Sequence, residues 1–191
     1  MLAPGNQYIV VLDTCVLAPM PLCDTLLRLA EDPALYIPKW SDDILRELRS
    51  TLQRMGYTLA QVDRRITAME TAFEEARVTG YECLVTSITN DPKDRHVLAA
   101  AVRCGAHAIV TDNVKHFPPE SVKAYDIDVV TPDEFLVSQF HLSQELLLGK
   151  LQNQASARNI SLGELLAALG KRAPKFCREA IGTIGSRSTW T

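Results

Sequence analysis

Four carboxylates stand at chemically suggestive positions in this 191-residue sequence. Asp13 closes the apolar run YIVVL, and Asp112 follows the apolar run that ends at Thr111. Glu47 lies within SDDILRELRSTL, and Asp94 lies within DPKDRHVLAAAV. Carboxylate oxygens are the preferred protein ligands of Mg²⁺ and Mn²⁺. Such an ion activates water and screens the charge of a phosphate, so the chemistry indicated is phosphodiester hydrolysis.

The elements that must position these acids alternate between strands and helices. Continuous apolar runs predict buried parallel strands at 8–12 and 106–111. Shorter patterns predict a strand at 35–37 and an edge strand at 128–130, before Pro132. Helical periodicity and capping residues predict helices over 21–31, 41–52 with Ser41 or Asp42 as the cap, 59–77, and from Asp91-Pro92 to near Gly105. This alternation predicts an α/β domain with a mostly parallel sheet.

The predicted sheet would bring the four acids to one edge. Ligands of parallel α/β sheets bind outside the carboxyl ends of the strands, where the following helices begin. Asp13 and Asp112 end strands, Asp94 lies in the first turn of its helix, and the longer Glu47 can reach back to the same edge. Clustered carboxylates repel one another and are stable as anions only beside a counter-charge. Because the neighbouring basic residues mostly point elsewhere by helical spacing, we expect a bound Mg²⁺ or Mn²⁺.

Each acid also has an ordinary structural interpretation. Asp13 and Asp112 are typical turn residues after strands. Asp94 is typical of the first turn of a helix, where a negative charge stabilises the helix dipole, and Glu47 is typical of an exposed helix surface. Other acid-lined enzymes fit less well. A phosphorelay receiver domain would need an adjacent acidic pair where Asp13-Thr14 stands, and an aspartyl phosphatase would need a second Asp at Cys15. Neither the dinucleotide-binding nor the P-loop glycine pattern occurs.

The four acidic segments resemble the PIN-domain family, specifically the VapC-like ribonuclease toxins of prokaryotic toxin–antitoxin pairs. The resemblance is carried by VVLDTCVL, SDDILRELRSTL, DPKDRHVLAAAV and IVTDNVKHFP, and spans residues 8 to about 135. It implies a three-layer αβα sandwich and Mg²⁺- or Mn²⁺-dependent cleavage of RNA by Asp13, Glu47, Asp94 and Asp112. It also implies frequent homodimerisation and inhibition by a cognate antitoxin protein. A PIN-like module that binds RNA or protein without cutting is the alternative.

The sequence departs from the family pattern at two positions. Cys15 stands where the family often has Asn, which removes a polar group that would help to orient the site. The family's fourth acid or Asn usually lies two residues after the Thr, which here is Asn113 rather than Asp112. Asn113 is therefore an alternative fourth ligand. Thr14 and Thr111 are expected to orient carboxylates or water, although both also suit a strand end.

Charge divides the chain unevenly. Residues 1–149 carry 13 basic and 21 acidic residues, a net charge of −8, whereas residues 150–191 carry 7 basic and 2 acidic residues, a net charge of +5. We expect a nuclease domain over 1–141, a helical extension over 142–184 with helices at 142–156, 161–170 and 174–181, and a flexible tail over 185–191. Lys171, Arg172, Lys175 and Arg178 are expected to contact RNA or an acidic partner, unless they form a solvated helical face.

The remaining composition indicates a cytoplasmic protein. No apolar run approaches the roughly eighteen residues that cross a bilayer, and the N-terminus lacks the pattern of a signal peptide, so we expect no membrane association. The five cysteines are odd in number and scattered, which predicts reduced thiols. Cys104 and His107 form a lone C-x-x-H without a second ligand pair, so a zinc site is not predicted.

Overall fold

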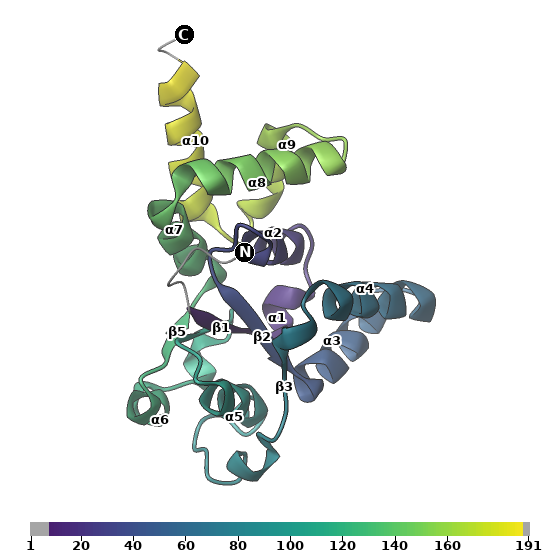
Figure 1. Ribbon diagram of the computed structural model, residues 1–191, viewed down its shortest axis with the longest axis vertical. Helices are drawn as coiled ribbons and strands as arrows, with labels where there is room; N and C mark the ends of the chain where they lie inside the picture. The colour runs from purple at the N-terminus through teal and green to yellow at the C-terminus, as the bar shows by residue number, and fades with distance from the viewer. Residues whose placement is uncertain (1–7, 189–191) are drawn as a thin grey trace.

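The computed structural model describes residues 8–188 and is shown in Figure 1. Its five strands are β1 (Ile9–Leu12), β2 (Ile37–Ser41), β3 (Arg77–Val78), β4 (Ala108–Val110) and β5 (Asp128–Val130). Its α-helices are α1 (Thr14–Leu17), α2 (Leu22–Ala30), α3 (Asp42–Arg54), α4 (Leu59–Ala72), α5 (Arg95–Cys104), α6 (Pro119–Val122), α7 (Pro132–Leu142), α8 (Gln144–Ala157), α9 (Leu162–Leu169) and α10 (Pro174–Ser188). Short 3₁₀ turns lie at 74–76, 82–84, 114–116 and 123–125.

The five strands form one parallel sheet in the order β3-β2-β1-β4-β5. Helix α5 covers one side of the sheet, and α2 and α7 lie on the other side (Figure 1). This arrangement is the predicted three-layer αβα architecture. Strand β1 lies in the middle, with β2 on one side and β4 on the other, so the residues that follow β1 and β4 are neighbours.

The central strands form where the sequence is continuously apolar. Val10, Val11 and Leu12 of β1 have no exposed surface, and neither do the three residues of β4. Helices cover the sheet on both sides, so both alternating sets of side chains are buried. The strand predicted at 35–37 lies further along the chain, as β2. It pairs with β1 over 37–39, and its buried residues Pro38 and Trp40 alternate with less buried ones. Lys39 interrupts the apolar run and hid this strand from the sequence pattern.

Helix ends near the site follow local capping rules. The Ser41 side chain accepts the N–H of Ile44 and caps α3, as predicted. Helix α5 ends at Gly105, which adopts the left-handed conformation that glycine tolerates. The helix begins later than expected, at Arg95, with Asp94 as its N-cap residue. Residues 91–94 form a turn, so Asp94 precedes the first helical residue.

Further elements differ from the sequence prediction. The predicted helix 59–77 ends at Ala72, because β3 pairs with the end of β2 and draws residues 77–78 into the sheet. Helix α1 directly after Asp13 was not predicted. Nor was α7, which begins with a capping box formed by Thr131 and Glu134.

The C-terminal helices pack on the α/β part of the molecule. Helix α8 lies against α2, where Thr25 Oγ1 donates to Gln154 Oε1 at 2.8 Å, and both side chains are almost fully buried. Helix α10 lies against α7, and the Asp133 carboxylate of α7 accepts backbone N–H groups of Lys175 and Phe176 at the start of α10. Phe140 of α7 packs edge-on against Phe176. These contacts join both parts in one continuous core.

Helix α10 extends further than predicted. It includes residues 185–188, which the sequence analysis assigned to a flexible tail, while 189–191 lie outside the described residues. All five cysteines are free thiols, as predicted. Within residues 8–188, no helix combines the length and apolar character needed to span a membrane.

Candidate functional site

Asp13 and Asp112 lie at the carboxyl edge of the sheet, after the adjacent strands β1 and β4. Asp13 is the N-cap residue of α1 and is only 3 % exposed. Its side chain does not cap the helix and is free to take other hydrogen bonds. Thr111 Oγ1 donates to Asp13 Oδ2 at 2.6 Å, so the predicted orienting contact of Thr111 is present.

Cys15 contributes more to this edge than the sequence suggested. Its thiol donates to Asp13 Oδ2 at 3.1 Å, and its sulfur accepts the backbone N–H of Asp112 at 3.1 Å. Burial, followed by the charge of Asp13, raises the pKa of Cys15 to about 12, so the group is a neutral thiol at physiological pH. The thiol therefore links the ends of β1 and β4, so position 15 still carries a hydrogen-bonding group although an Asn amide is absent.

Glu47 approaches from α3 with a partly exposed side chain. Thr14 Oγ1 lies 3.2 Å from Glu47 Oε2 and 3.1 Å from the carbonyl oxygen of Ile44, so Thr14 contacts the α3 backbone as well as the carboxylate. His96 Nε2 lies 3.5 Å from Glu47 Oε2. Burial lowers the pKa of His96, but Glu47, Asp43 and Asp13 raise it more, so the net shift is upward.

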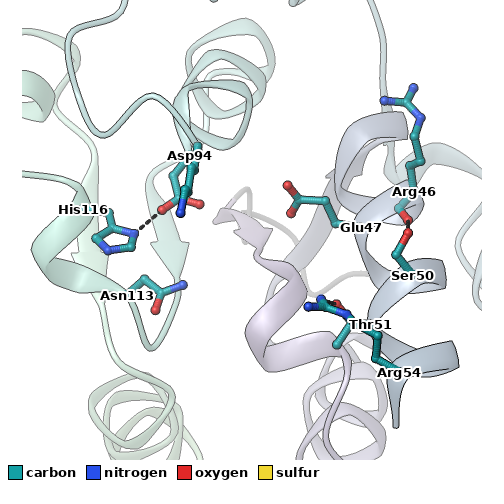
Figure 2. A pocket seen from close by; sticks show the side chains of 9 residues that line it. Arg46, Glu47, Ser50, Thr51, Arg54, Asp94, Asn113 and His116 are labelled. Carbon is teal, nitrogen blue, oxygen red and sulfur yellow. Dashed lines mark hydrogen bonds and ion pairs between the residues drawn. The ribbon is translucent and has the colours of Figure 1, made fainter. Parts of the chain in front are cut away.

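Asp94 approaches from the opposite side and is 8 % exposed. Asp94 Oδ2 contacts Nδ1 of His116, which lies in the turn after β4 (Figure 2). Burial raises the pKa of the Asp94 carboxyl, the charge of Asp13 raises it further, and His116 opposes the shift. Burial is the largest cause of this upward shift, and the contribution of Asp13 means that the two carboxylates lie within electrostatic range of each other.

The two candidates for the fourth position have different surroundings. The Asp112 carboxylate forms an ion pair with Arg172, from the turn between α9 and α10. Asn113 instead lines the same pocket as Glu47 and Asp94. The Asn113 backbone N–H donates to Thr111 Oγ1 at 3.0 Å, so Thr111 holds both Asp13 and the segment that carries Asn113.

An open pocket of about 390 Å³ lies between α3 and the start of α5. Figure 2 shows Glu47 on one wall, facing Asp94, His116 and Asn113 across the opening. The lining residues are Arg46, Glu47, Ser50, Thr51, Arg54, Lys93, Asp94, Asn113 and His116. All nine are polar or charged, which suits a charged, hydrated ligand.

The basic side chains of the described chain that contact the acids lining this pocket are the histidines His96 and His116. In the described part of the chain, no Lys or Arg forms an ion pair with Asp13, Glu47 or Asp94. The three residues that place one ligand atom each within 4.8 Å of the others are Asp91, Asp94 and His116. Asp13 and Glu47 do not belong to that group with their present side-chain conformations. Asp13 nevertheless raises the pKa of Asp94, and both Asp13 and Glu47 raise the pKa of His96.

The structure adds two residues that the sequence analysis did not name. His96 and His116 each contact a carboxylate of the site. No spacing rule would have found them, because the chain reverses between Asp94 and His116. Helical spacing predicted that most of the basic residues near the acids point elsewhere, but two of them, Arg46 and Lys93, line the pocket.

The basic residues of the C-terminal extension lie on its surface. Lys171, Arg172, Lys175 and Arg178 are all exposed. Arg172 reaches Asp112 beside the pocket, which brings the extension to the edge of the site. None of the four lines the pocket itself.

Comparisons with known proteins match the part of the chain that carries the acids. The family model of the PIN domain matches residues 9–115. A protein of Mycobacterium tuberculosis (strain ATCC 25618 / H37Rv), named "Putative ribonuclease VapC50", is 41 % identical over 104 residues, which cover 53 % of this chain and 62 % of that protein. The chain thus matches less than two thirds of that relative's length. No solved structure matches the chain.

Proposed function

The chain belongs to the PIN domain family, and we propose that it is a divalent-metal-dependent endoribonuclease that hydrolyses RNA phosphodiester bonds. One observation carries the proposal. Glu47 and Asp94 line one polar pocket from separate elements, and Asp13 lies near enough to raise the pKa of Asp94. No Lys or Arg of the described chain is ion-paired with any of the three. An acidic site can accept an anionic substrate only if a cation lies between them.

The residues present fit Mg²⁺ or Mn²⁺. Asp13, Glu47 and Asp94 offer only carboxylate oxygens, the donor type of these hard ions. Burial and the charge of Asp13 raise the pKa of the Asp94 carboxyl, and a bound cation would favour its ionised form. The Glu47 side chain is 46 % exposed and can change rotamer, so we expect ion binding to draw it toward the two buried aspartates.

When bound, the ion would supply Lewis-acid activation of water and screening of the phosphate charge. The protein's own residues position the carboxylates. Thr111 contacts Asp13, Thr14 contacts Glu47 and His116 contacts Asp94, so each carboxylate has a hydrogen-bonding neighbour, and the two buried aspartates are held in orientation. We expect water to attack phosphorus in line and leave 5′-phosphate and 3′-hydroxyl ends. No side-chain nucleophile is required.

For the fourth position we propose Asn113 in place of Asp112. Asn113 lines the pocket, and its side-chain carbonyl is an oxygen donor of the type that these ions accept. The Asp112 carboxylate is already engaged by Arg172. In this arrangement the Asp112 carboxylate holds the C-terminal extension beside the site through Arg172. The Asp112 backbone N–H donates to the Cys15 sulfur.

We further propose a biological setting of the VapC type: an RNA substrate in the cytoplasm, a homodimeric assembly, and a cognate antitoxin protein that blocks the acidic pocket. The similarity to "Putative ribonuclease VapC50" supports this setting. The alternative is a PIN-like module that binds RNA or protein without cutting. The intact set Asp13, Glu47 and Asp94 favours cleavage over binding alone.

The decisive experiment incubates the purified chain with transfer, ribosomal and messenger RNAs, with and without Mn²⁺, and maps the ends produced. Cleavage should require the ion and should disappear in Asp13→Ala and Asp94→Asn. Circular dichroism and thermal melting would show that both variants fold. Undiminished cleavage by either variant would remove the metal-site assignment. Retention of RNA without products under any divalent ion would support the binding-only alternative.

We propose that Lys171, Lys175 and Arg178 contact RNA or the acidic part of a partner. Deleting the extension is a poor test, because α8 and α10 share the core with α2 and α7. Replacing the three residues with Gln removes only charge. A smaller salt dependence of RNA binding in that triple variant would support the contact, and an unchanged dependence would leave these residues as a solvated face.

A further inference from the structure

The pocket walls carry two cations that no acid in the described chain neutralises. Arg54, near the end of α3, donates from Nη2 to Thr51 Oγ1 at 2.9 Å and makes no ion pair. Lys93, in the turn before α5, makes no ion pair and is exposed. Both line the same pocket as Glu47 and Asp94. Arg46, the third cation of the lining, is instead paired with Asp43.

Among arginines elsewhere on the described surface, some are ion-paired and some, such as Arg64 and Arg158, are not. Arg28, Arg49, Arg77 and Arg172 each form an ion pair with a nearby carboxylate. Arg54 lies in the acidic part of the chain, residues 1–149, and still has only a hydroxyl partner among the described residues. Figure 2 shows its guanidinium reaching back toward the opening that Glu47 also faces. A cation held there by a neutral neighbour keeps its charge available for a ligand.

We propose that Arg54 and Lys93 bind the phosphates that flank the scissile phosphate of a single RNA strand. The inference rests on the proposed nuclease function. Arg54 belongs to the α3 wall, which also carries Glu47, and Lys93 directly precedes Asp94 on the opposite wall. Each wall therefore presents a cation as well as a carboxylate to a strand that crosses the pocket. Thr51 positions the Arg54 guanidinium.

The character of the lining indicates what part of the RNA this pocket recognises. Bases of single strands are usually held by stacking on aromatic rings. The nine lining residues include no Phe, Tyr or Trp. Arg, Lys, Ser and Thr side chains are the common ligands of phosphate and sugar. The two cations should therefore contribute affinity that is independent of base sequence.

The test measures binding of fluorescein-labelled 12-nucleotide oligo(U) and oligo(A) by anisotropy, in EDTA, from 50 to 200 mM KCl. EDTA prevents cleavage, so binding is measured whether or not the chain is a nuclease. Each of Arg54→Gln and Lys93→Gln should lower the magnitude of the log K against log salt slope by about 0.7, the value for one phosphate contact on a single strand. The loss should be equal for both oligonucleotides, and additive in the double variant.

Arg64→Gln and Lys123→Gln are the matched controls, because both residues are exposed and lie outside this pocket. A slope reduction no larger than that of the controls, or one seen with a single base sequence, would overturn the proposal. Loss of poly-L-glutamate binding with RNA binding intact would assign the cations to an acidic protein segment and overturn it too. If the slopes change but no RNA is cut with Mn²⁺, the nuclease proposal fails and the phosphate contacts stand.

Discussion

The two walls of the pocket differ in how firmly they are held. On the α5 and β4 side, Asp94 is 8 % exposed and is contacted by His116. On the α3 side, the Glu47 side chain is 46 % exposed, and its nearest hydrogen-bonding neighbours are Thr14 at 3.2 Å and His96 at 3.5 Å. The wall on the α5 and β4 side, here called the fixed wall, is therefore preorganised. The wall on the α3 side can adjust to its ligand.

The segment Asp13-Thr14-Cys15 joins the two walls. Asp13 and Cys15 contact the end of β4 through Thr111 and the Asp112 backbone. Thr14, between them, points the other way and contacts Glu47 and the α3 backbone. Alternate residues of this short segment thus reach opposite walls. If ion binding closes the pocket, it should move Glu47 toward a fixed Asp13 and Asp94, not the reverse.

The largest expected effect is on the rate of cleavage, and it differs between substitutions on the two walls. Asp94→Asn should lower Mn²⁺-dependent RNA cleavage by more than about 10²-fold, the upper range for groups that only orient a ligand. Glu47→Gln should cost less, about 10- to 100-fold, and should recover partly as Mn²⁺ is raised, because its exposed side chain adds to a site already formed by the buried aspartates. Initial rates over a Mn²⁺ series measure both. Equal, unrecoverable losses would show that the walls are equally essential.

The next comparison lies within the fixed wall. Asn113→Ala should lower the rate of cleavage about 10-fold or more, as expected for loss of a group at the ion. Asp112→Asn should change it by no more than about twofold, because Arg172 already engages that carboxylate. Arg172→Gln is the control for the ion pair itself. A larger loss in Asp112→Asn than in Asn113→Ala would make Asp112 the fourth ligand.

Substitution of His116 tests whether the ion is bound by residues of both walls or of one wall alone. Asp91, Asp94 and His116 place their ligand atoms within 4.8 Å of one another, so they could hold an ion without Asp13 or Glu47. If His116 only positions Asp94, His116→Ala should weaken the apparent Mn²⁺ affinity about 10-fold and leave the rate at saturating Mn²⁺ nearly unchanged.

Asp91→Asn provides the second half of that test. Its carboxylate accepts the backbone N–H of Lys93, which suits a turn former, so the variant should keep its Mn²⁺ affinity. Isothermal titration with Mn²⁺ alone measures both variants without RNA. Loss of binding in both, with Glu47→Gln unaffected, would place the ion on the fixed wall only.

The sequence predicted the elements whose signals are local. Strands β1 and β4 are continuous apolar runs, Ser41 caps α3 and Gly105 ends α5, so each was recognisable without the rest of the chain. Strand β3 was not, because its two residues are held only by pairing with β2. The capping box Thr131-Glu134 is a local signal for α7 that the preceding strand and Pro132 obscured.

The same limit applies to the site. The approach of Asp13 and Asp94 to one sheet edge follows from topology, which the alternation of elements predicted. The choice between Asp112 and Asn113 does not follow, because neighbouring residues after a strand point in different directions. That choice depends on Arg172, sixty residues away in sequence. Contacts of this kind, like that between Asp94 and His116, arise only when the chain is folded.

The smallest expected effect concerns Cys15, which helps to hold the fixed wall. Cys15→Ser keeps a hydrogen-bonding group beside Asp13 and the Asp112 N–H, whereas Cys15→Ala leaves that N–H without its acceptor. Cys15→Ala should therefore destabilise the fold by about 1 kcal/mol and lower cleavage a few-fold, and Cys15→Ser should do neither. Urea unfolding and initial rates measure the two effects.

The protonation state of Cys15 offers an independent measurement of the same contacts. Because burial and the Asp13 charge raise the pKa of Cys15 to about 12, almost no thiolate exists at pH 8, and thiolate is the form that iodoacetamide attacks. Exposed Cys83 should be alkylated first in the folded protein. Neutralising Asp13 with Asp13→Asn removes one cause of the raised pKa, so alkylation of Cys15 should become faster while burial still keeps it slower than that of Cys83. Alkylation of Cys15 ahead of Cys83 in the unaltered protein would mean that the link between β1 and β4 is open in solution, and the wall taken to be rigid would then be the adjustable one.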